Sequence, residues 1–327
     1  MRTRILVLII VFSFLSTPVK GETNGYFSIG YAKGQKQADV SMGSFLNPQL
    51  GLIFSGDVTA KIDYVSEIRF KREDSIELEQ ALVRFKPSDA FNLSLGLFLV
   101  PFGRYNQSNR PHQTQLINFP LNVEKMFPSS WRDMGLLVEG EFSGFFYSAY
   151  LGNGLGEAEN SIGAQQFRDN NTDKGKGGRV GITLSRGFDV AYSYYRGKYD
   201  DDEENTRDLV LQGVDIIWQN QDFQILSEYS KAYLENPDGS DTGKTEGYFI
   251  QLSLKGSRLQ PVASYQRIKY QDPFLGEGIS EERSRWAVGL VLAASENLFL
   301  SFEYDFNSEK ETKLKDNSFS AQVVLSF

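Results

Sequence analysis

The residues that could do chemistry in this 327-residue chain are charged side chains that recur at every second position of extended segments. In VTAKIDYVSEIRFK (58–71), Lys61, Asp63, Glu67 and Arg69 alternate with mostly apolar residues. Successive side chains of a strand point to opposite faces, so these charges share one face. Such a face either is solvated, with its charges pairing among themselves, or lines a water-filled passage whose ion preference the charges set.

If the face lines a passage, its two walls differ in charge. The segments 57–71 and 76–86 are mostly basic on this face, whereas other segments carry acidic pairs. The Debye length is about 8 Å at physiological salt, so only charges at a constriction should act strongly on a passing ion. The candidate pore-lining and constriction residues are Lys61, Arg69, Arg84, Arg104, Arg110, Glu139, Glu141, Arg179, Arg285, Glu303 and Asp305.

The stretch 103–130 is the segment best suited to form a constriction. It contains Arg104, Arg110 and His112 among aromatic residues, a set that could contact a small anion or a sugar. Four of the ten prolines fall between positions 101 and 128, and proline stiffens a segment while removing it from strand hydrogen bonding. The stretch is therefore expected to be either an inward-folded eyelet or an ordinary external loop.

Catalysis is not expected. His112 is the only histidine, and although Ser108 is close in sequence, nothing indicates a carboxylate that would orient the pair. The chain has no cysteine, so a metal site of the Cys or His type cannot be built. We therefore expect no enzymatic activity, no metal site and no cofactor.

The acidic run DDDEE (200–204) is a further candidate for ligand chemistry. It could bind divalent cations that bridge lipopolysaccharide, but it lacks the oxygen spacing and the glycine of a calcium loop. A solvated acidic loop is the simpler interpretation.

The elements that would position these residues are strands with a period of two. In NLFLSFEYDFN (297–307), apolar residues on one face alternate with Glu303 and Asp305 on the other. Three segments, at 46–55, 76–86 and 207–218, alternate poorly, so the count could lie between 14 and 18. The sixteen strands expected are 24–33, 46–55, 57–71, 76–86, 91–102, 131–142, 144–153, 177–185, 188–198, 207–218, 222–233, 246–255, 258–270, 284–293, 297–308 and 317–327.

The connections between these strands alternate short and long. Tight turns are expected at SGD (55–57), FSG (142–144) and SRG (185–187), among others, and long polar stretches lie between them. Outer-membrane barrels have short periplasmic turns and long external loops. The alternation therefore favours a transmembrane antiparallel β-barrel over a soluble sandwich, and it places both termini on the periplasmic side.

Aromatic residues lie beside most of the short turns, where an outward ring would sit at headgroup level. The chain itself ends on an aromatic, in FSAQVVLSF (319–327). A soluble β-protein has no reason to place aromatics outward on one rim. The predicted periplasmic girdle is Phe54, Phe85, Phe91, Phe142, Phe145, Phe188, Trp218, Phe223 and Phe327.

Residues 1–21 predict a secretory signal peptide, because Arg2 and Arg4 precede an apolar run (5–15) too short to span a bilayer. Its removal takes three basic residues from the chain, so the formal charge changes from −8 for the full chain to −11 for the barrel region 22–327. This acidic balance argues against nucleic acid as a partner. Mean hydropathy is negative at −0.35, as expected where only alternate residues face lipid.

The stretch 96–154 (GLFLVPFGRYNQ…YLGNG) resembles the phosphate-selective porin O/P-like superfamily. The resemblance rests on three motifs and on the terminal Phe327. The motifs are a G-x-F-x-x-P-F-G strand end, a W-R-D-x-G strand and a Y-x-x-x-x-x-N-G hairpin. The resemblance implies a sixteen-stranded barrel, usually a homotrimer, with 103–130 folded inward and Phe327 recognised by the barrel-assembly machinery. Selective members carry a dense ladder of basic residues, whereas the inward charges of this chain are mixed.

We therefore expect a Gram-negative outer-membrane porin, in contact with outer-membrane lipid and lipopolysaccharide, that lets small hydrophilic solutes or ions diffuse passively through a lumen narrowed by 103–130. Sixteen strands leave an aqueous channel, whereas eight fill with side chains. The alternative is a non-conducting adhesion or scaffold barrel that acts through its external loops.

Overall fold

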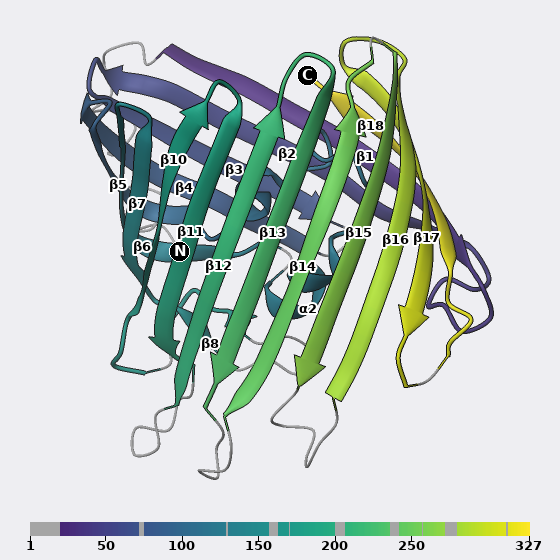
Figure 1. Ribbon diagram of the computed structural model, residues 1–327. Helices are drawn as coiled ribbons and strands as arrows, with labels where there is room; N and C mark the ends of the chain where they lie inside the picture. The colour runs from purple at the N-terminus through teal and green to yellow at the C-terminus, as the bar shows by residue number, and fades with distance from the viewer. Residues whose placement is uncertain are drawn as a thin grey trace, which may run out of the picture.

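Within the described residues, sixteen strands form one closed antiparallel barrel in the computed structural model (Figure 1). The structure describes residues 20–71, 75–128, 130–156, 163–169, 171–199, 207–235, 242–256, 258–271, 280–311 and 313–327. The barrel strands are β1 (Lys20–Gly34), β2 (Ser44–Thr59), β3 (Ile62–Lys71), β4 (Ser75–Ser88), β5 (Phe91–Leu99), β6 (Arg132–Phe142), β7 (Phe145–Gly152), β10 (Gly175–Ser185), β11 (Phe188–Lys198), β12 (Asp208–Gln219), β13 (Phe223–Leu234), β14 (Gly243–Leu254), β15 (Leu259–Gln271), β16 (Ser280–Ala293), β17 (Leu298–Glu309) and β18 (Ser318–Ser326).

Each strand pairs with its neighbours in the chain, and β1 pairs with β18 to close the ring. Phe327 completes this closure, because its backbone N–H donates to the Gly25 carbonyl (2.9 Å) and its carbonyl accepts from the Gly25 N–H (2.7 Å). A closed ring leaves no strand edge unpaired. The predicted all-β, sixteen-stranded antiparallel barrel is confirmed.

The connections that follow β2, β4, β6, β10, β12, β14 and β16 are short and lie at one end of the barrel, which we call the turn end, and the C-terminus lies there too (Figure 1). The opposite end is called the loop end. The turn expected at 55–57 is wrong, because β2 continues to Thr59 and the turn is formed by Ala60 and Lys61. Pairing continues through Gly56 and slips only between Asp57 and Thr59, which shows that the glycine lies within a strand. The acidic run 200–204 and residues 1–19 lie outside the described residues.

The outward face is apolar and the inward face is polar around much of the barrel. On β14, for example, Ile250 and Leu252 are exposed outward, whereas Gln251 and Ser253 are buried within. Exposed apolar side chains in this alternating arrangement are typical of a barrel surrounded by lipid. Neither helix among the described residues is long and apolar enough to cross a membrane.

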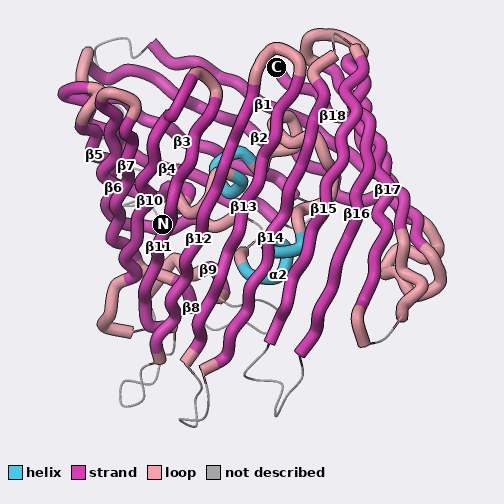
Figure 2. Tube along the Cα trace, viewed as in Figure 1, coloured by secondary structure: helices cyan, strands magenta, loops and turns pink. Residues whose placement is uncertain are grey.

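The segment 100–131, which connects β5 to β6, lies inside the barrel (Figure 2). It contains the 3-10 helix η1 (Tyr105–Ser108) and the helix α2 (Leu121–Met126), which packs against β13, β14 and β15. A small two-stranded sheet of β8 (Leu155–Gly156) and β9 (Ala164–Gln165) lies beyond β7. The fold thus places one long segment across its own lumen.

Candidate functional site

The inward segment begins at a glycine that fits closely against the wall. Gly103 has φ +65°, and a Cβ there would lie 2.6 Å from a carboxylate oxygen of Glu228 on β13. This closeness lets the buried Glu228 carboxylate accept from the backbone N–H groups of Arg104 (2.6 Å) and Tyr105 (2.5 Å). The Arg104 side chain pairs with Asp189 of β11, with Nη2 2.7 Å from Oδ2. The first turn of the segment is therefore tied to the wall by two carboxylates.

Arg110 ties the middle of the segment to β3. Its Nε donates to both carboxylate oxygens of Glu67, at 2.9 and 3.0 Å, and its Nη2 also contacts this carboxylate. Glu67 is fully buried, Arg110 is only 8% exposed, and Gln80 donates to the same carboxylate. A buried ion pair of this kind is costly to break, because the remaining partner stays charged and unpaired. Arg110 is thus an anchor, and its charge is neutralised.

His112 lies next to this anchor, with its ring 4.8 Å from that of Tyr26. Burial lowers the pKa of His112, and the neighbouring Arg110 charge acts in the same direction. The imidazole is therefore neutral at pH 7, and it adds no charge to the lumen.

The tip of the segment is held by β17. The backbone N–H groups of Ile117 and Asn118 both donate to Glu303, and the Asn118 side chain donates to Asp305 (2.8 Å). Both carboxylates are buried. The acidic pair predicted on this strand therefore positions the segment by accepting hydrogen bonds from its backbone and from the Asn118 side chain.

Helix α2 fixes the return of the segment. Its first residue, Leu121, donates its backbone N–H to Gln266 of β15 (3.1 Å). Arg285 of β16 donates to the Phe119 carbonyl (3.2 Å) and pairs with Glu124 at 3.3 Å. The segment is thus tied to the wall on several sides.

An apolar core fills one side of the lumen. Trp131 is buried and stacks on Phe127 at 5.7 Å, while its edge meets Tyr195 of β11 at 5.1 Å. The inward residues Leu209 and Leu211 of β12 belong to the same cluster. Close packing of apolar side chains excludes water, so any passage must run beside this core.

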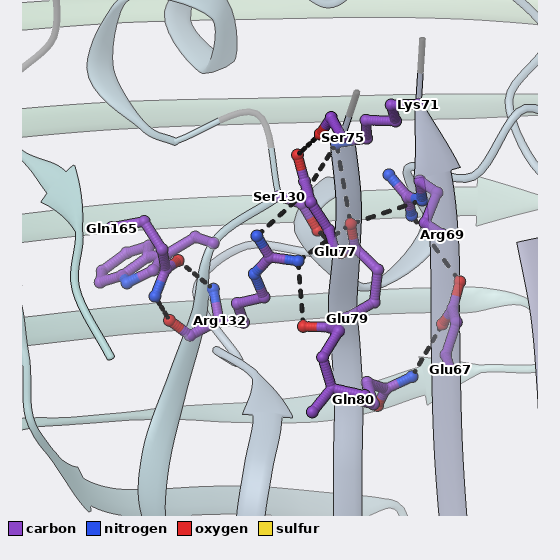
Figure 3. A network of polar contacts seen from close by, with 12 residues as sticks. Glu67, Arg69, Lys71, Ser75, Glu77, Glu79, Gln80, Ser130, Arg132 and Gln165 are labelled. Atoms are coloured by element: carbon purple, nitrogen blue, oxygen red, sulfur yellow. Dashed lines mark hydrogen bonds and ion pairs between the residues drawn. The ribbon is translucent and has the colours of Figure 1, made fainter. Parts of the chain in front are cut away.

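A charged network occupies the wall of β3 and β4 at the loop end (Figure 3). Glu79 is fully buried, with Arg69 Nε at 3.4 Å and Arg132 Nη1 at 3.1 Å from one oxygen. Lys71 pairs with Glu77 at 3.0 Å, and Arg132 reaches Glu77 at 3.1 Å. The expectation of a mostly basic wall is therefore wrong, because acids interleave with the basic groups.

Three cavities flank the inward segment. Two lie toward the loop end, with volumes of about 340 and 510 Å³, and one of about 310 Å³ lies toward the turn end. Asn118 lines all three, and Thr114 lines the first and the third. Thr114 and Asn118 thus border spaces on both sides of the segment.

The structure brings six of the predicted lumen residues to the inward segment or its supports: Arg69, Arg104, Arg110, Arg285, Glu303 and Asp305. Others lie elsewhere. Arg179 forms a two-point pair with Asp215 (2.6 and 2.8 Å), and Arg84 lies 3.7 Å from Asp63. Lys61 is exposed in a turn and is not on the barrel wall. Glu139 is half-buried on β6, and Glu141 is exposed near the turn end.

The predicted girdle residues all lie at or near the turn end. Several of their rings touch one another: Phe142 with Phe145 at 5.2 Å, Trp218 with Phe223 at 5.0 Å, and Trp218 with Phe188 at 6.4 Å. The remaining members, Phe54, Phe85, Phe91 and Phe327, are half-buried to exposed. That these rings meet membrane headgroups stays a prediction.

Sequence reasoning missed Asn118, Glu79 and Arg132 as lumen residues. Glu79 was hidden by a β-bulge, because Glu67 pairs with Gln80 while Ile68 pairs with Leu78. The extra residue turns Glu77, Glu79 and Gln80 all inward and breaks the period of two. Arg132 stands within the W-R-D motif, and that motif was the available signal.

Comparison with known proteins gives one sequence relative and many structural neighbours. No protein-family model matches the chain. A curated protein of Aquifex aeolicus (strain VF5), described as uncharacterized, is 25% identical over 189 residues, which is 52% of this chain and 43% of that protein. The match thus covers less than half of the relative's length.

The structural neighbours are outer-membrane proteins. OmpF of Salmonella typhi, in complex with daunomycin, has a TM-score of 0.72 at 15% identity over 94% of this chain and 98% of that one. The anion-selective porin from Comamonas acidovorans has a TM-score of 0.69 at 13% identity, covering 94% and 99%. OmpT of Vibrio cholerae, in its trimer form, has a TM-score of 0.66 at 11% identity, covering 94% and 99%. These likenesses show the fold.

Proposed function

We propose that the protein is an outer-membrane porin through which small hydrophilic solutes diffuse passively. The observation that carries the proposal is the set of cavities on both sides of the inward segment, all bordered by Asn118, inside a closed barrel with an apolar outer face. Solutes would pass beside the inward segment on the side that its apolar core leaves open. The two similar proteins named as a porin and as OmpF support this function by their shared fold.

The motifs that resemble the phosphate-selective porin O/P-like superfamily have structural tasks in this fold. Asp133, the D of W-R-D, accepts from the backbone N–H groups of Met134, Asn153 and Gly154 at 2.7 to 2.9 Å. The motif thereby joins the start of β6 to the end of β7. We propose kinship with that superfamily on these motifs. Phosphate selectivity is not part of the proposal, because Arg69, Arg104 and Arg110 are all paired with acids.

A catalytic role is not proposed. His112 is neutral and packed against Tyr26, and Ser108 Oγ donates to the Arg104 carbonyl (3.2 Å). Neither contact prepares a nucleophile, which needs a base within hydrogen-bond reach. Transport down a gradient needs no cofactor.

The orientation follows from the proposal. Residues 1–21 would be cleaved as a signal peptide, which would shorten β1 by Lys20 and Gly21, paired here with Asp57 and Gly56. The turn end and both termini would face the periplasm, and the loop end would face lipopolysaccharide. The protein would act as a homotrimer, as the trimer form of one structural neighbour suggests. Chemical cross-linking of the protein in outer membranes should then give a trimer band, and a monomer alone would oppose this assignment.

Phe327 would serve as the signal for the barrel-assembly machinery. Deleting Phe327 should then lower assembly in cells more than it lowers spontaneous folding into lipid vesicles, as measured by heat-modifiable gel mobility. Equal losses would assign Phe327 to barrel closure alone, since its backbone pairs with Gly25 in either setting.

Planar-bilayer recording of the purified protein tests the proposed function. Insertion should give discrete open-channel steps. Their conductance should rise linearly with salt concentration, because hydrated ions would diffuse through a water-filled passage. A folded barrel that inserts into the bilayer without conducting would contradict the proposal and would favour the scaffold alternative.

A further inference from the structure

The cavity at the turn end differs in chemistry from the two at the loop end. Its polar lining is dominated by amides, with six glutamines at Gln107, Gln113, Gln115, Gln219, Gln224 and Gln251. Arg104 is the one charged residue among those that line this cavity, and it is paired with Asp189. The loop-end cavities, by contrast, include Arg69, Lys71 and Glu77 or Asp305 and Arg285.

Four of these glutamines form a continuous chain of amides between the wall of β12 to β14 and the inward segment. Gln251 donates to Gln115 (2.9 Å), Gln115 to Gln224 (3.2 Å), and Gln224 to Gln219 (3.2 Å). Gln115 belongs to the inward segment, whereas the other three project from β14, β13 and β12. The chain ends at Lys255, whose ammonium donates to Gln219 Oε1 (3.3 Å) and to the Asn220 carbonyl (3.0 Å).

The chain is prepared for a ligand that both donates and accepts hydrogen bonds. A glutamine amide carries two N–H donors and two acceptor lone pairs. Within the chain, Gln115 and Gln224 each use one N–H and one lone pair. One donor and one acceptor therefore remain on each of these two amides for a partner with hydroxyl groups. Gln219 offers its N–H groups, because its Oε1 already accepts from Gln224 and Lys255.

The same cavity has an apolar side. Ile217, Leu226, Leu116 and Pro120 line it beside the amides. A site with apolar surface and a few fixed polar groups is typical of binding sites for small molecules. Arg104, the charged residue of this lining, is already paired with Asp189. A charged solute would therefore leave water there with little compensation, which is costly, whereas a neutral polyol would exchange its water contacts for amide contacts.

We propose that this amide cavity is a binding site for a neutral polyhydroxylated solute of the saccharide class on its way through the lumen. The inference rests on the proposed channel function and adds the solute class and the residues that select it. Gln219, Gln224 and Gln115 would bind hydroxyl groups, and the apolar residues would contact the C–H face of the sugar ring.

The test is block of single-channel current by sucrose, compared with sucrose 6-phosphate, added at the turn-end side. Sucrose should give a saturable block, and the phosphate should require at least about tenfold higher concentration. Gln219→Leu should raise the half-blocking concentration of sucrose by about fivefold to tenfold. Gln219 makes no hydrogen bond with the inward segment, so the change should leave that segment in place, and the block is expressed relative to the variant's own current without sugar.

Gln322→Leu is the matched control, because Gln322 is an inward glutamine that lines a loop-end cavity. It should leave sucrose block unchanged. The proposal is overturned if sucrose does not block, if the phosphate blocks equally well, or if Gln219→Leu has no effect or only the effect of the control.

A second readout separates this inference from the channel function. Equilibrium dialysis of radiolabelled sucrose against detergent-solubilised protein should show binding that Gln224→Leu weakens as Gln219→Leu does. A barrel that conducts but does not bind sucrose would contradict the inference and leave the proposed function intact. A barrel that binds sucrose in the amide cavity but does not conduct would contradict only the proposed function.

Discussion

Arg110 shows how single residues hold the lumen in shape. A cationic residue in an inward segment is easily interpreted as a free charge that attracts anions, and the sequence supported that interpretation. In the structure the guanidinium pairs with buried Glu67 through Nε and Nη2, and its Nη1 donates to Gln113 within the segment. Arg104 is different, because its side chain is 30% exposed and its partner Asp189 is 22% exposed. Two arginines six positions apart thus have different tasks.

Arg110→Ala should therefore destabilise the protein by about 3–5 kcal/mol, because it leaves a buried carboxylate without its main partner. The inward segment should also loosen, which would appear as added noise in the open-channel current. Arg104→Ala is the matched control and should cost no more than about 1 kcal/mol, since its pair is partly solvated. Thermal unfolding in detergent measures both, and equal losses would contradict the assignment of Arg110 as the anchor.

At the scale of elements, the inward segment depends on how it leaves β5. The P-F-G sequence ends the strand, and Gly103 adopts a left-handed conformation that brings its backbone against Glu228. A side chain at this position would meet the carboxylate that holds Arg104 and Tyr105. Position 103 thus requires glycine for two reasons: its φ is left-handed, and the Glu228 carboxylate leaves no room for a Cβ.

Gly103→Ala should cost about 2–4 kcal/mol, from backbone strain plus the displaced hydrogen bonds to a buried charge. Gly144→Ala offers a matched comparison, because Gly144 has φ +79° in a turn where the nearest atom to a new Cβ is 3.3 Å away. That change should cost only about 1 kcal/mol. If thermal unfolding shows the two variants to be equally stable, contact with Glu228 is not what fixes the start of the segment.

The strands themselves were predictable because their period of two is the direct result of lipid outside and water within. In the three segments that alternate poorly, an inner core or a slip in strand register interrupts the period of two. On β12, Leu209 and Leu211 face inward yet are apolar, because the inner core packs on them. On β4 the bulge at Glu79 shifts the pattern, and β1 and β2 slip in register between Ser28 and Gly30. Contacts between the inward segment and distant strands leave no pattern in the local sequence, so these contacts could not be predicted.

For the whole molecule, the central claim is that one segment crosses a wet lumen and narrows it at Asn118. The hydrogen bonds from this segment reach β3, β11, β13, β15, β16 and β17, so the constriction belongs to the entire barrel. Because the chain has no cysteine, a single introduced thiol reports on its position without background.

The most direct measurement is therefore modification of Asn118→Cys by a cationic, membrane-impermeant methanethiosulfonate reagent during planar-bilayer recording. We predict rapid reaction and a fall in conductance of at least about half, because the added group stands beside all three cavities. Ile250→Cys, on the exposed outer face, should leave the current unchanged. Conductance that persists after complete labelling of Asn118→Cys, or that falls equally in Ile250→Cys, would contradict the account.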